Sequence, residues 1–389
     1  MTGPISAPRL TVCTIGDAAS PHEYNWSEAI ARQGCDVIML SPRPRADARI
    51  HVRVIPLATS RIWLVRHLVN LWRWCRAVAG MPADIFHAHY ASDYGPWALG
   101  LLGRGPVALT AMGSDILHAA RGDMGPLTRW LTRRVLRRAE LVVSHSRHVA
   151  EVAVSQGARC SSVHISLWGV DLRTFARDDG AGDAQRKSWG LSPQHFVVLS
   201  PRSLDPIYCQ DAIVAGIAEG ADDARPAALV IPVRNRADPR AADLSTFAAR
   251  VGVDLRLVDA LDHAGMPAAY SAADAVISMA LSDNVPRTIL EAMACRTPVI
   301  ARNLPDLKGL VIDGRHAILV DGTPATIGRA IKALSADEAL CRRLADAGRE
   351  FAERNADLDR DTRAIVDRYR LILGRPDAGG AGGRAETAQ

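Results

Sequence analysis

The stretch 282–300, SDNVPRTILEAMACRTPVI, contains two carboxylates eight positions apart, and this spacing could serve ligand binding. Asp283 precedes a predicted helix start, and Glu291 lies about two turns inside that helix, within an otherwise apolar run. A helix start attracts phosphate through its free N–H groups and the positive end of its dipole. Carboxylates beside it could accept hydrogen bonds from hydroxyl groups on either side of a diphosphate. The simpler alternative is that Asp283 caps the helix and Glu291 pairs with a nearby arginine.

The residues between the two carboxylates predict where this helix begins. Pro286 suits the first helical position, because its missing N–H would have no intrahelical partner there. The amides of Arg287 and Thr288 would then be free at the helix start, where a phosphate could accept their hydrogen bonds. We expect the helix to run to about Cys295.

His87 and His89, in the sequence HAHY, are a second group that could do chemistry. Their spacing places both rings on one side of a strand, near its end. A metal site would need further ligands, which the sequence does not identify. Core or hydrogen-bonded histidines are the commoner outcome of such a pattern, so we predict no metal ligand and no cofactor.

The elements that must position these residues alternate between short apolar runs and helical patterns. Such alternation is typical of parallel sheets covered by helices. Helices are expected over 25–33 and 61–79 in the first half and over 337–373 at the end. The predicted strands are 9–16, 36–41, 51–55, 84–89, 107–111 and 141–144 in the first half, and 196–201, 228–232, 255–258, 275–278, 298–301 and 318–320 in the second.

A polar, glycine-containing stretch, 177–194, separates the two halves and reads as a linker. We therefore expect a first Rossmann-like domain over 1–177 and a second over 192–357. The closing helix, about 358–374, is expected to pack back on the first domain. Residues 375–389 have the composition of a disordered tail.

The composition narrows the class of protein. A chain of 389 residues is long enough for two domains, and 48% hydrophobic with 23% charged residues describes a globular protein. The net charge of +5 suits anionic ligands or a lipid surface but is no nucleic-acid signature. The seven scattered cysteines never form CxxC, and neither a signal peptide nor a membrane span is evident. These features predict a cytoplasmic protein.

Several motifs together resemble the retaining glycosyltransferases of family 4, over roughly residues 9 to 373. Those enzymes adopt the GT-B fold, with two Rossmann-like doubly wound domains facing a central cleft. In them, two acids at the E-x7-E spacing occupy the positions of Asp283 and Glu291. The motifs that carry the resemblance are LEAMACRTPVI (290–300), YSAADAVIS (270–278), GVDLRTF (169–175), ADIFHAHYAS (83–92), TAMGSDIL (110–117) and the opening IGDAASPH with Trp26 (15–26).

The resemblance implies transfer of a sugar, with retention and without a metal, from a nucleoside diphosphate sugar. The acceptor would be a glycan precursor, a lipid-linked molecule or a small molecule. Asp283, in place of the usual glutamate, would contact the hydroxyls of the donor sugar, and Glu291 would hold the ribose. His89 matches a family histidine near the donor sugar and the reaction centre.

Further site residues follow from the same resemblance. Arg202 matches an arginine on the donor's phosphates, a duty that suits a charged, forked guanidinium. Arg234 could add charge there or simply lie on the surface. The expected acceptor-side residues, by position alone, are Asp17, His22, Asn25 and Trp26. The expected donor-binding residues are Gly16, Arg202, Arg234, Asn284, Val285, Pro286, Arg287 and Thr288.

The sequence also departs from the family pattern. Ile207 stands where the family has a lysine, Arg296 replaces a glycine, and NLPDLKG (303–309) replaces a glycine-rich turn. Together with Asp283, these changes keep alternatives open. One is a non-catalytic GT-B partner subunit, and another is an epimerase or phosphorylase of the same fold.

Two basic stretches in the first half, 61–79 and 126–140, combine arginines with tryptophans. Amphipathic helices of this kind can lie in a membrane interface. Ordinary packing against the sheet is the alternative for Trp63, Trp72 and Trp74. Membrane contact would place the protein peripherally on the inner face of the membrane and would favour a lipid-linked acceptor.

Overall fold

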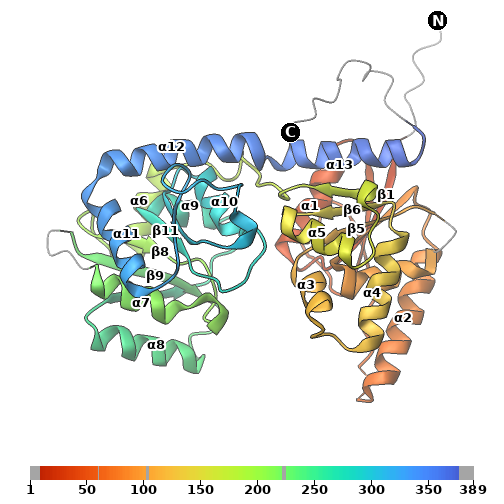
Figure 1. Ribbon diagram of the computed structural model, residues 1–389, viewed down its shortest axis with the longest axis horizontal. Coiled ribbons are helices and arrows are strands. Elements are labelled where there is room, and N and C mark those ends of the chain that lie inside the picture. Colours follow the sequence, from red (N-terminus) through yellow and green to blue (C-terminus); the bar gives the residue numbers. More distant parts are fainter. Residues whose placement is uncertain (1–8, 60, 102–104, 221–224, 376–389) are drawn as a thin grey trace, which may run out of the picture. The chain divides into compact units, whose positions relative to one another are not determined.

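The computed structural model describes residues 9–59, 61–101, 105–220 and 225–375, and its contacts divide the chain into two compact units. The first unit comprises Met1–Trp168 with Leu358–Gln389, and the second comprises Gly169–Asp357. Each contains one parallel sheet with helices packed on it (Figure 1). The predicted class of two Rossmann-like α/β domains is confirmed. The expected tail lies, from residue 376 onward, outside the described residues.

The sheet of the first unit has seven strands in the order β3-β2-β1-β4-β5-β6-β7. The order reverses at β1, which has β2 on one side and β4 on the other, and ligands of such sheets bind where this reversal occurs. Six of the strands match predicted runs, whereas β7 is too short and too exposed to show an apolar pattern. The bounds are β1 Thr11–Ile15, β2 Asp36–Ser41, β3 His51–Val54, β4 Ile85–His89, β5 Val107–Ala111, β6 Leu141–Ser144 and β7 Val163–Ile165.

Helices on this sheet include one from the far end of the sequence. In α13, Ile365, Val366 and Tyr369 are buried in a cluster with Trp26 and Ile30 of α1. The helix bounds are α1 Pro21–Arg32, α2 Trp63–Ala79, α3 Ser114–Arg121, α4 Pro126–Arg138, α5 Arg147–Ser155 and α13 Leu358–Ile372, with shorter turns η1 Tyr90–Tyr94, η2 Gly95–Leu101 and η3 Cys160–Ser162.

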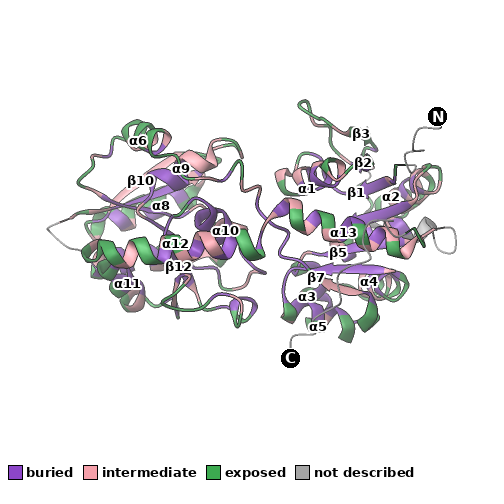
Figure 2. Ribbon diagram, turned by 90° about the horizontal axis from the view of Figure 1, so that it is seen from above, coloured by how far each residue is buried: buried purple, intermediate pink, exposed green. Residues whose placement is uncertain are grey.

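The sheet of the second unit has six strands in the order β10-β9-β8-β11-β12-β13, which reverses at β8. Figure 2 shows its strands as mostly buried and its helices as exposed on their outer faces. The strands are β8 Phe196–Leu199, β9 Ala227–Val233, β10 Asp254–Asp259, β11 Ala275–Ser278, β12 Val299–Arg302 and β13 Ile318–Val320. The helices are α6 Asp179–Ser188, α7 Gln210–Glu219, α8 Pro239–Arg250, α9 Met266–Ala272, α10 Arg287–Ala294, α11 Pro324–Ala336 and α12 Glu338–Asn355, with turns η4 Pro206–Tyr208 and η5 Pro305–Leu307.

The interpretation of 177–194 as a linker is wrong, because the stretch contains α6. Asp178 caps this helix by accepting a hydrogen bond from the Ala181 amide. Gly182 lies against α9, and a Cβ at this glycine would come within 2.7 Å of the Ser271 carbonyl oxygen. The glycine therefore permits close helix packing rather than flexibility.

The chain leaves the first unit and enters the second between Trp168 and Gly169, which is earlier than the predicted boundary at position 177. Phe175 explains the difference, since its fully buried ring contacts His263 and Tyr270 of the second unit. Residues 169–177 therefore pack with the second unit.

Candidate functional site in each unit

The ends of β8 and β11 bring Arg202 and Asp283 together in the second unit. Arg202 Nη2 donates to Asp283 Oδ2 at 2.7 Å, and the Asn284 amide donates to Asp283 Oδ1 at 2.9 Å. The Arg202 guanidinium also lies 4.1 Å above the centre of the Tyr208 ring. Burial raises the pKa of Asp283, while Arg202 opposes this effect. The pair is preformed at the point where doubly wound sheets bind ligands.

Glu291 is buried on α10 and is 5% exposed. Tyr270 donates its hydroxyl to Glu291 Oε2 at 2.8 Å, and Arg287 Nε lies 3.7 Å from Oε1. Burial raises the pKa of Glu291, and Arg287 works against it. Pairing with a nearby arginine, expected under the simpler alternative, is thus present.

Two buried hydroxyl oxygens around α10, Ser278 Oγ and Thr288 Oγ1, lack a hydrogen-bond partner among the described residues, and Glu291 Oε1 has only the ion pair with Arg287. Each such atom costs roughly 1–3 kcal/mol, and most proteins avoid this cost. These buried polar atoms therefore lower the stability of the folded protein around the start of α10. Functional sites commonly show that property.

The start of α10 differs slightly from the prediction. The helix begins at Arg287, with Pro286 as the residue before it rather than the first helical one. The Val285 amide donates to the side-chain oxygen of Asn284, so the preceding loop is held by its own side chains. Phosphate binding at this helix start would therefore fall to Arg287 and Thr288.

The remaining donor-side positions are spread along neighbouring strands. Arg234 is exposed directly after β9, the neighbour of β8. Ile207 lies in η4, where its carbonyl accepts from the Leu281 amide and so ties η4 to the loop after β11. Position 207 thus contributes backbone structure here instead of a lysine charge. Arg296 has φ of 54°, where glycine is favoured, and pairs with Asp346 at 2.6 Å.

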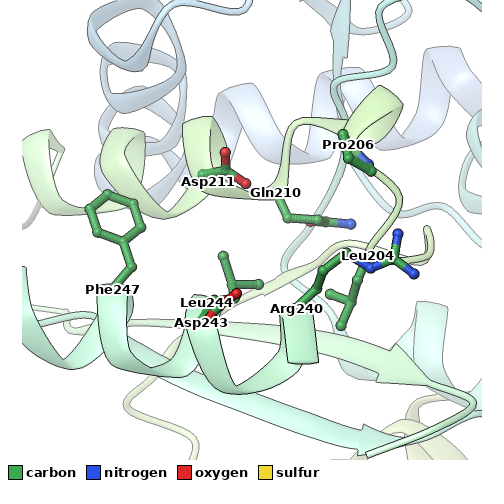
Figure 3. Close-up of a pocket in the computed structure, with 8 residues that line it drawn as sticks. All are labelled: Leu204, Pro206, Gln210, Asp211, Arg240, Asp243, Leu244 and Phe247. Atoms are coloured by element: carbon green, nitrogen blue, oxygen red, sulfur yellow. The ribbon is translucent and has the colours of Figure 1, made fainter. Parts of the chain in front are cut away.

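A pocket of about 460 Å³ lies between the segment after β8 and α8 (Figure 3). Gln210 reaches from it back to the carbonyls of Arg202 and Ser203. The positively charged residue that lines the pocket, Arg240, is already paired with Asp238. Its two other charged side chains are carboxylates, which disfavour a diphosphate. The lining residues are Leu204, Pro206, Gln210, Asp211, Arg240, Asp243, Leu244 and Phe247.

His89 lies at the end of β4 in the first unit, fully buried between the rings of Trp26 and Trp168. Neither of its ring nitrogens has a hydrogen-bond partner among the described residues. Gly16, after β1, borders this ring, since a Cβ there would lie 2.8 Å from His89 Cδ2 and 2.5 Å from Glu23 Oε2. Only glycine fits that gap.

His87 has a different environment. Its Nδ1 lies 2.5 Å from the Tyr369 hydroxyl and its Nε2 lies 2.6 Å from Thr110 Oγ1. Both nitrogens are satisfied inside the unit, which makes His87 a hydrogen-bonded core histidine. Within the described ranges, no three His, Cys, Asp or Glu side chains form a group that could hold a metal ion.

The expected acceptor-side residues divide by exposure. His22 is exposed and Asn25 is half-buried, whereas Trp26 is 2% exposed and packs under the two histidines. The Trp26 ring therefore supports His89 instead of lining an open surface. Asp17 pairs with Arg43.

Glu23 is a residue that the sequence analysis missed. Its carboxylate is 4% exposed and accepts a hydrogen bond from the Asp17 amide at 2.7 Å. Burial raises the pKa of Glu23 to about 7. The available signal was an acid in the first turn of the helix that follows the first strand.

Burial also predicts a pH dependence of stability. It lowers the pKa of His89 to about 3 and that of His87 well below its ordinary value. At these two positions the unfolded chain binds more protons than the folded chain, so each histidine lowers the free energy of unfolding by roughly 1.4 kcal/mol for each pH unit below about 6.5. Glu23, whose pKa is raised, acts in the opposite direction, so the effect of His89 is measured as a difference between two proteins. Urea unfolding at pH 7 and pH 5 should show a smaller loss for His89→Asn than for wild type. Equal losses of unfolding free energy in the two proteins would contradict the lowered pKa of His89.

Comparisons with known proteins agree with this arrangement. A sequence model of Glycosyltransferase Family 4 matches residues 19–174, and one of Glycosyl transferases group 1 matches residues 243–351. The chain belongs to glycosyltransferase family 4. The two matches cover most of both units and include Asp283 and Glu291.

Relatives of this family 4 glycosyltransferase include D-inositol 3-phosphate glycosyltransferases. That of Streptomyces bingchenggensis is 29% identical over 305 residues, which cover 74% of this chain and 66% of the relative. That of Xylanimonas cellulosilytica is 29% identical over 409 residues, which cover 95% and 94%.

Solved structures show the same GT-B fold. Anabaena HepE, solved in complex with UDP and glucose, has a TM-score of 0.77 at 16% identity and covers 92% of this chain and 98% of its own. Sucrose-phosphate synthase from Thermosynechococcus elongatus has a TM-score of 0.78 at 17% identity, with coverage of 94% and 100%. At these identities the likeness concerns the fold alone.

Proposed function

We propose that this family 4 glycosyltransferase moves a sugar from a nucleoside diphosphate sugar to a hydroxyl-bearing acceptor, with retention and without a metal. The observation that carries the proposal is the pair of carboxylates, half-buried Asp283 and buried Glu291, held beside Arg202 and the start of α10. Complexes of the similarly folded HepE with UDP and with UDP-glucose support a donor of this class.

Each residue of this group takes a part that suits its chemistry. Glu291 accepts hydrogen bonds from the ribose hydroxyls, and Asp283 accepts them from the donor sugar. Arg202 has five N–H donors, and its bond to Asp283 leaves others for the diphosphate. The start of α10 adds the positive end of its dipole to the same charge.

The transfer step needs no covalent enzyme intermediate. The bond from the sugar's anomeric carbon to the diphosphate oxygen breaks, and the acceptor oxygen bonds to that carbon on the same face. The leaving diphosphate takes the acceptor's proton, while Arg202 and the helix start stabilise its charge. His89, neutral at physiological pH, is assigned to the reaction centre beside the donor sugar.

On the acceptor side, we assign Asp17, His22 and Asn25 to binding the acceptor and Glu23 to supporting them. The acceptor is a glycan precursor, a lipid-linked molecule or a small molecule such as the inositol phosphates named for the relatives. Peripheral membrane contact through residues 61–79 belongs to the same proposal, since it would bring a lipid-linked acceptor to the enzyme.

Binding and turnover without metal test the proposal. Calorimetry with UDP, GDP and ADP in the presence of EDTA should find one diphosphate that binds, because arginine and helix start replace a metal. Hydrolysis of the matching nucleotide sugar should also survive EDTA. Loss of binding on chelation, restored by manganese or magnesium, would overturn metal independence. Binding without any turnover across a panel of nucleotide sugars would instead indicate a non-catalytic partner subunit.

A further inference from the structure

Two helices of the first unit, α2 and α4, expose large apolar side chains. The side chains of Trp72 on α2 and Trp130 on α4 are 63% and 57% exposed. Scattered exposed apolar residues are ordinary, whereas larger groups of them are typical of interaction sites. We call this group the α2/α4 patch; its apolar members are Val65, Leu68, Val69, Trp72, Leu127 and Trp130.

The two helices share a base inside the first unit. Both pack against η2. On the inner side of α2, the fully buried Trp74 ring stacks on Trp97 of η2 with centroids 4.0 Å apart. Core packing, one of the two interpretations of this helix, therefore holds for Trp74, whereas Trp72 faces outward. The side chain of Trp63 lies outside the described residues.

The charged side chains on α2 and α4 themselves all have one sign. Neither helix contains an aspartate or a glutamate. Helix α2 carries three arginines, and helix α4 carries five. Arg76 lies 5.9 Å from the Trp72 ring, and Arg134 lies 5.7 Å from the Trp130 ring. An arginine beside an exposed tryptophan can hold a phosphate while the ring enters the layer beneath. The arginines are Arg66, Arg73, Arg76, Arg129, Arg133, Arg134, Arg137 and Arg138.

We propose that the α2/α4 patch docks the protein on an anionic membrane surface, with its arginines on lipid phosphates and its tryptophans in the interface. Charge complementarity selects this occupant. A second copy of the chain, in a two-fold dimer through this patch, would bring the same arginines face to face. In the described ranges, no helix is long and apolar enough to cross a membrane.

This proposal extends the membrane contact of the proposed function and does not depend on sugar transfer. Co-sedimentation should show binding to vesicles of mixed phosphatidylcholine and phosphatidylglycerol, and weak binding to phosphatidylcholine alone. Arg66→Gln, Arg73→Gln and Arg76→Gln together should weaken binding by about fivefold per charge removed. Trp72→Ser with Trp130→Ser should weaken binding and reduce the blue shift of tryptophan fluorescence on adding vesicles.

A matched control removes the same charge from the second unit. Arg329→Gln, Lys332→Gln and Arg343→Gln together alter exposed positions on α11 and α12 and should leave vesicle binding unchanged. Binding of the preferred diphosphate, measured by calorimetry, should be normal in every variant, which separates docking from the donor site.

Three results would overturn the proposal. They are wild-type protein that ignores anionic vesicles at low salt, a control variant that loses as much binding as the α2 variant, and a dimer in solution that the tryptophan substitutions dissociate. The last result would identify a second copy of the chain as the occupant.

Discussion

Glu291→Ala is expected to weaken the binding of the free nucleoside diphosphate by about 10- to 150-fold. The ribose is present in donor and product alike, so both should lose affinity. Charge-assisted hydrogen bonds of this kind contribute roughly 1.5–3 kcal/mol, which corresponds to that range. Calorimetry with the diphosphate that binds wild type best is the direct measurement.

Two controls make this result interpretable. Glu291→Gln can still accept the hydrogen bond from Tyr270, so it should keep the local structure while losing the charge. Because Glu291→Ala also removes the carboxylate beside the partly buried Arg287, thermal unfolding must show that the variant is folded. Equal diphosphate binding by wild type and Glu291→Ala would make Glu291 a structural acid.

Asp283→Ala should behave differently from Glu291→Ala. Asp283 is assigned to the sugar only, and its removal leaves the Arg202 charge available to the phosphates. Diphosphate binding should therefore be spared while the transfer rate falls. A strong loss of diphosphate binding would instead show that Asp283 is needed to hold Arg202 and the loop before α10.

Tyr369→Ala is expected to lower the free energy of unfolding by about 3–5 kcal/mol, the range for large buried aromatic side chains. The side chain is fully buried in α13, and its hydroxyl contacts His87. Tyr369→Phe should lose about 1 kcal/mol, because only the hydrogen bond is removed. Urea unfolding provides the measurement.

The same helix supplies a matched control for Tyr369. Leu371 is exposed, and Leu371→Ala should change stability by less than about 0.5 kcal/mol. A Tyr369→Ala variant as stable as Leu371→Ala would show that α13 contributes little to the first unit.

Local patterns predicted most of the sheet elements, because a buried parallel strand is a short apolar run bounded by polar residues. The runs at 36–41, 107–111, 141–144, 275–278 and 318–320 coincide with strands. Strand β7 was not predicted, because His164 and Ile165 are not buried and do not belong to an apolar run. Helix α6 was not predicted, because its glycines are typical of a linker. Their role in packing becomes clear only when α9 is seen against α6.

The site was predictable only where its spacing is local. Asp283 and Glu291 share one segment, so their spacing could be read directly. Arg202 comes from a strand end far along the chain, and the sheet order alone brings it to Asp283. Glu23 is visible in the sequence as an acid in the first turn of a helix, but its raised pKa comes from burial beside Gly16, which depends on the folded structure.

The placement of α13 has a consequence for synthesis. The second unit is one continuous stretch, Gly169–Asp357, whereas the first needs residues from both sides of it. On the ribosome, domains fold as their residues emerge. The nascent first unit therefore lacks α13 while the whole second unit is translated. Until then, the position that Tyr369 fills beside His87 is not occupied by that side chain. The unit that emerges first is therefore the one that finishes folding last.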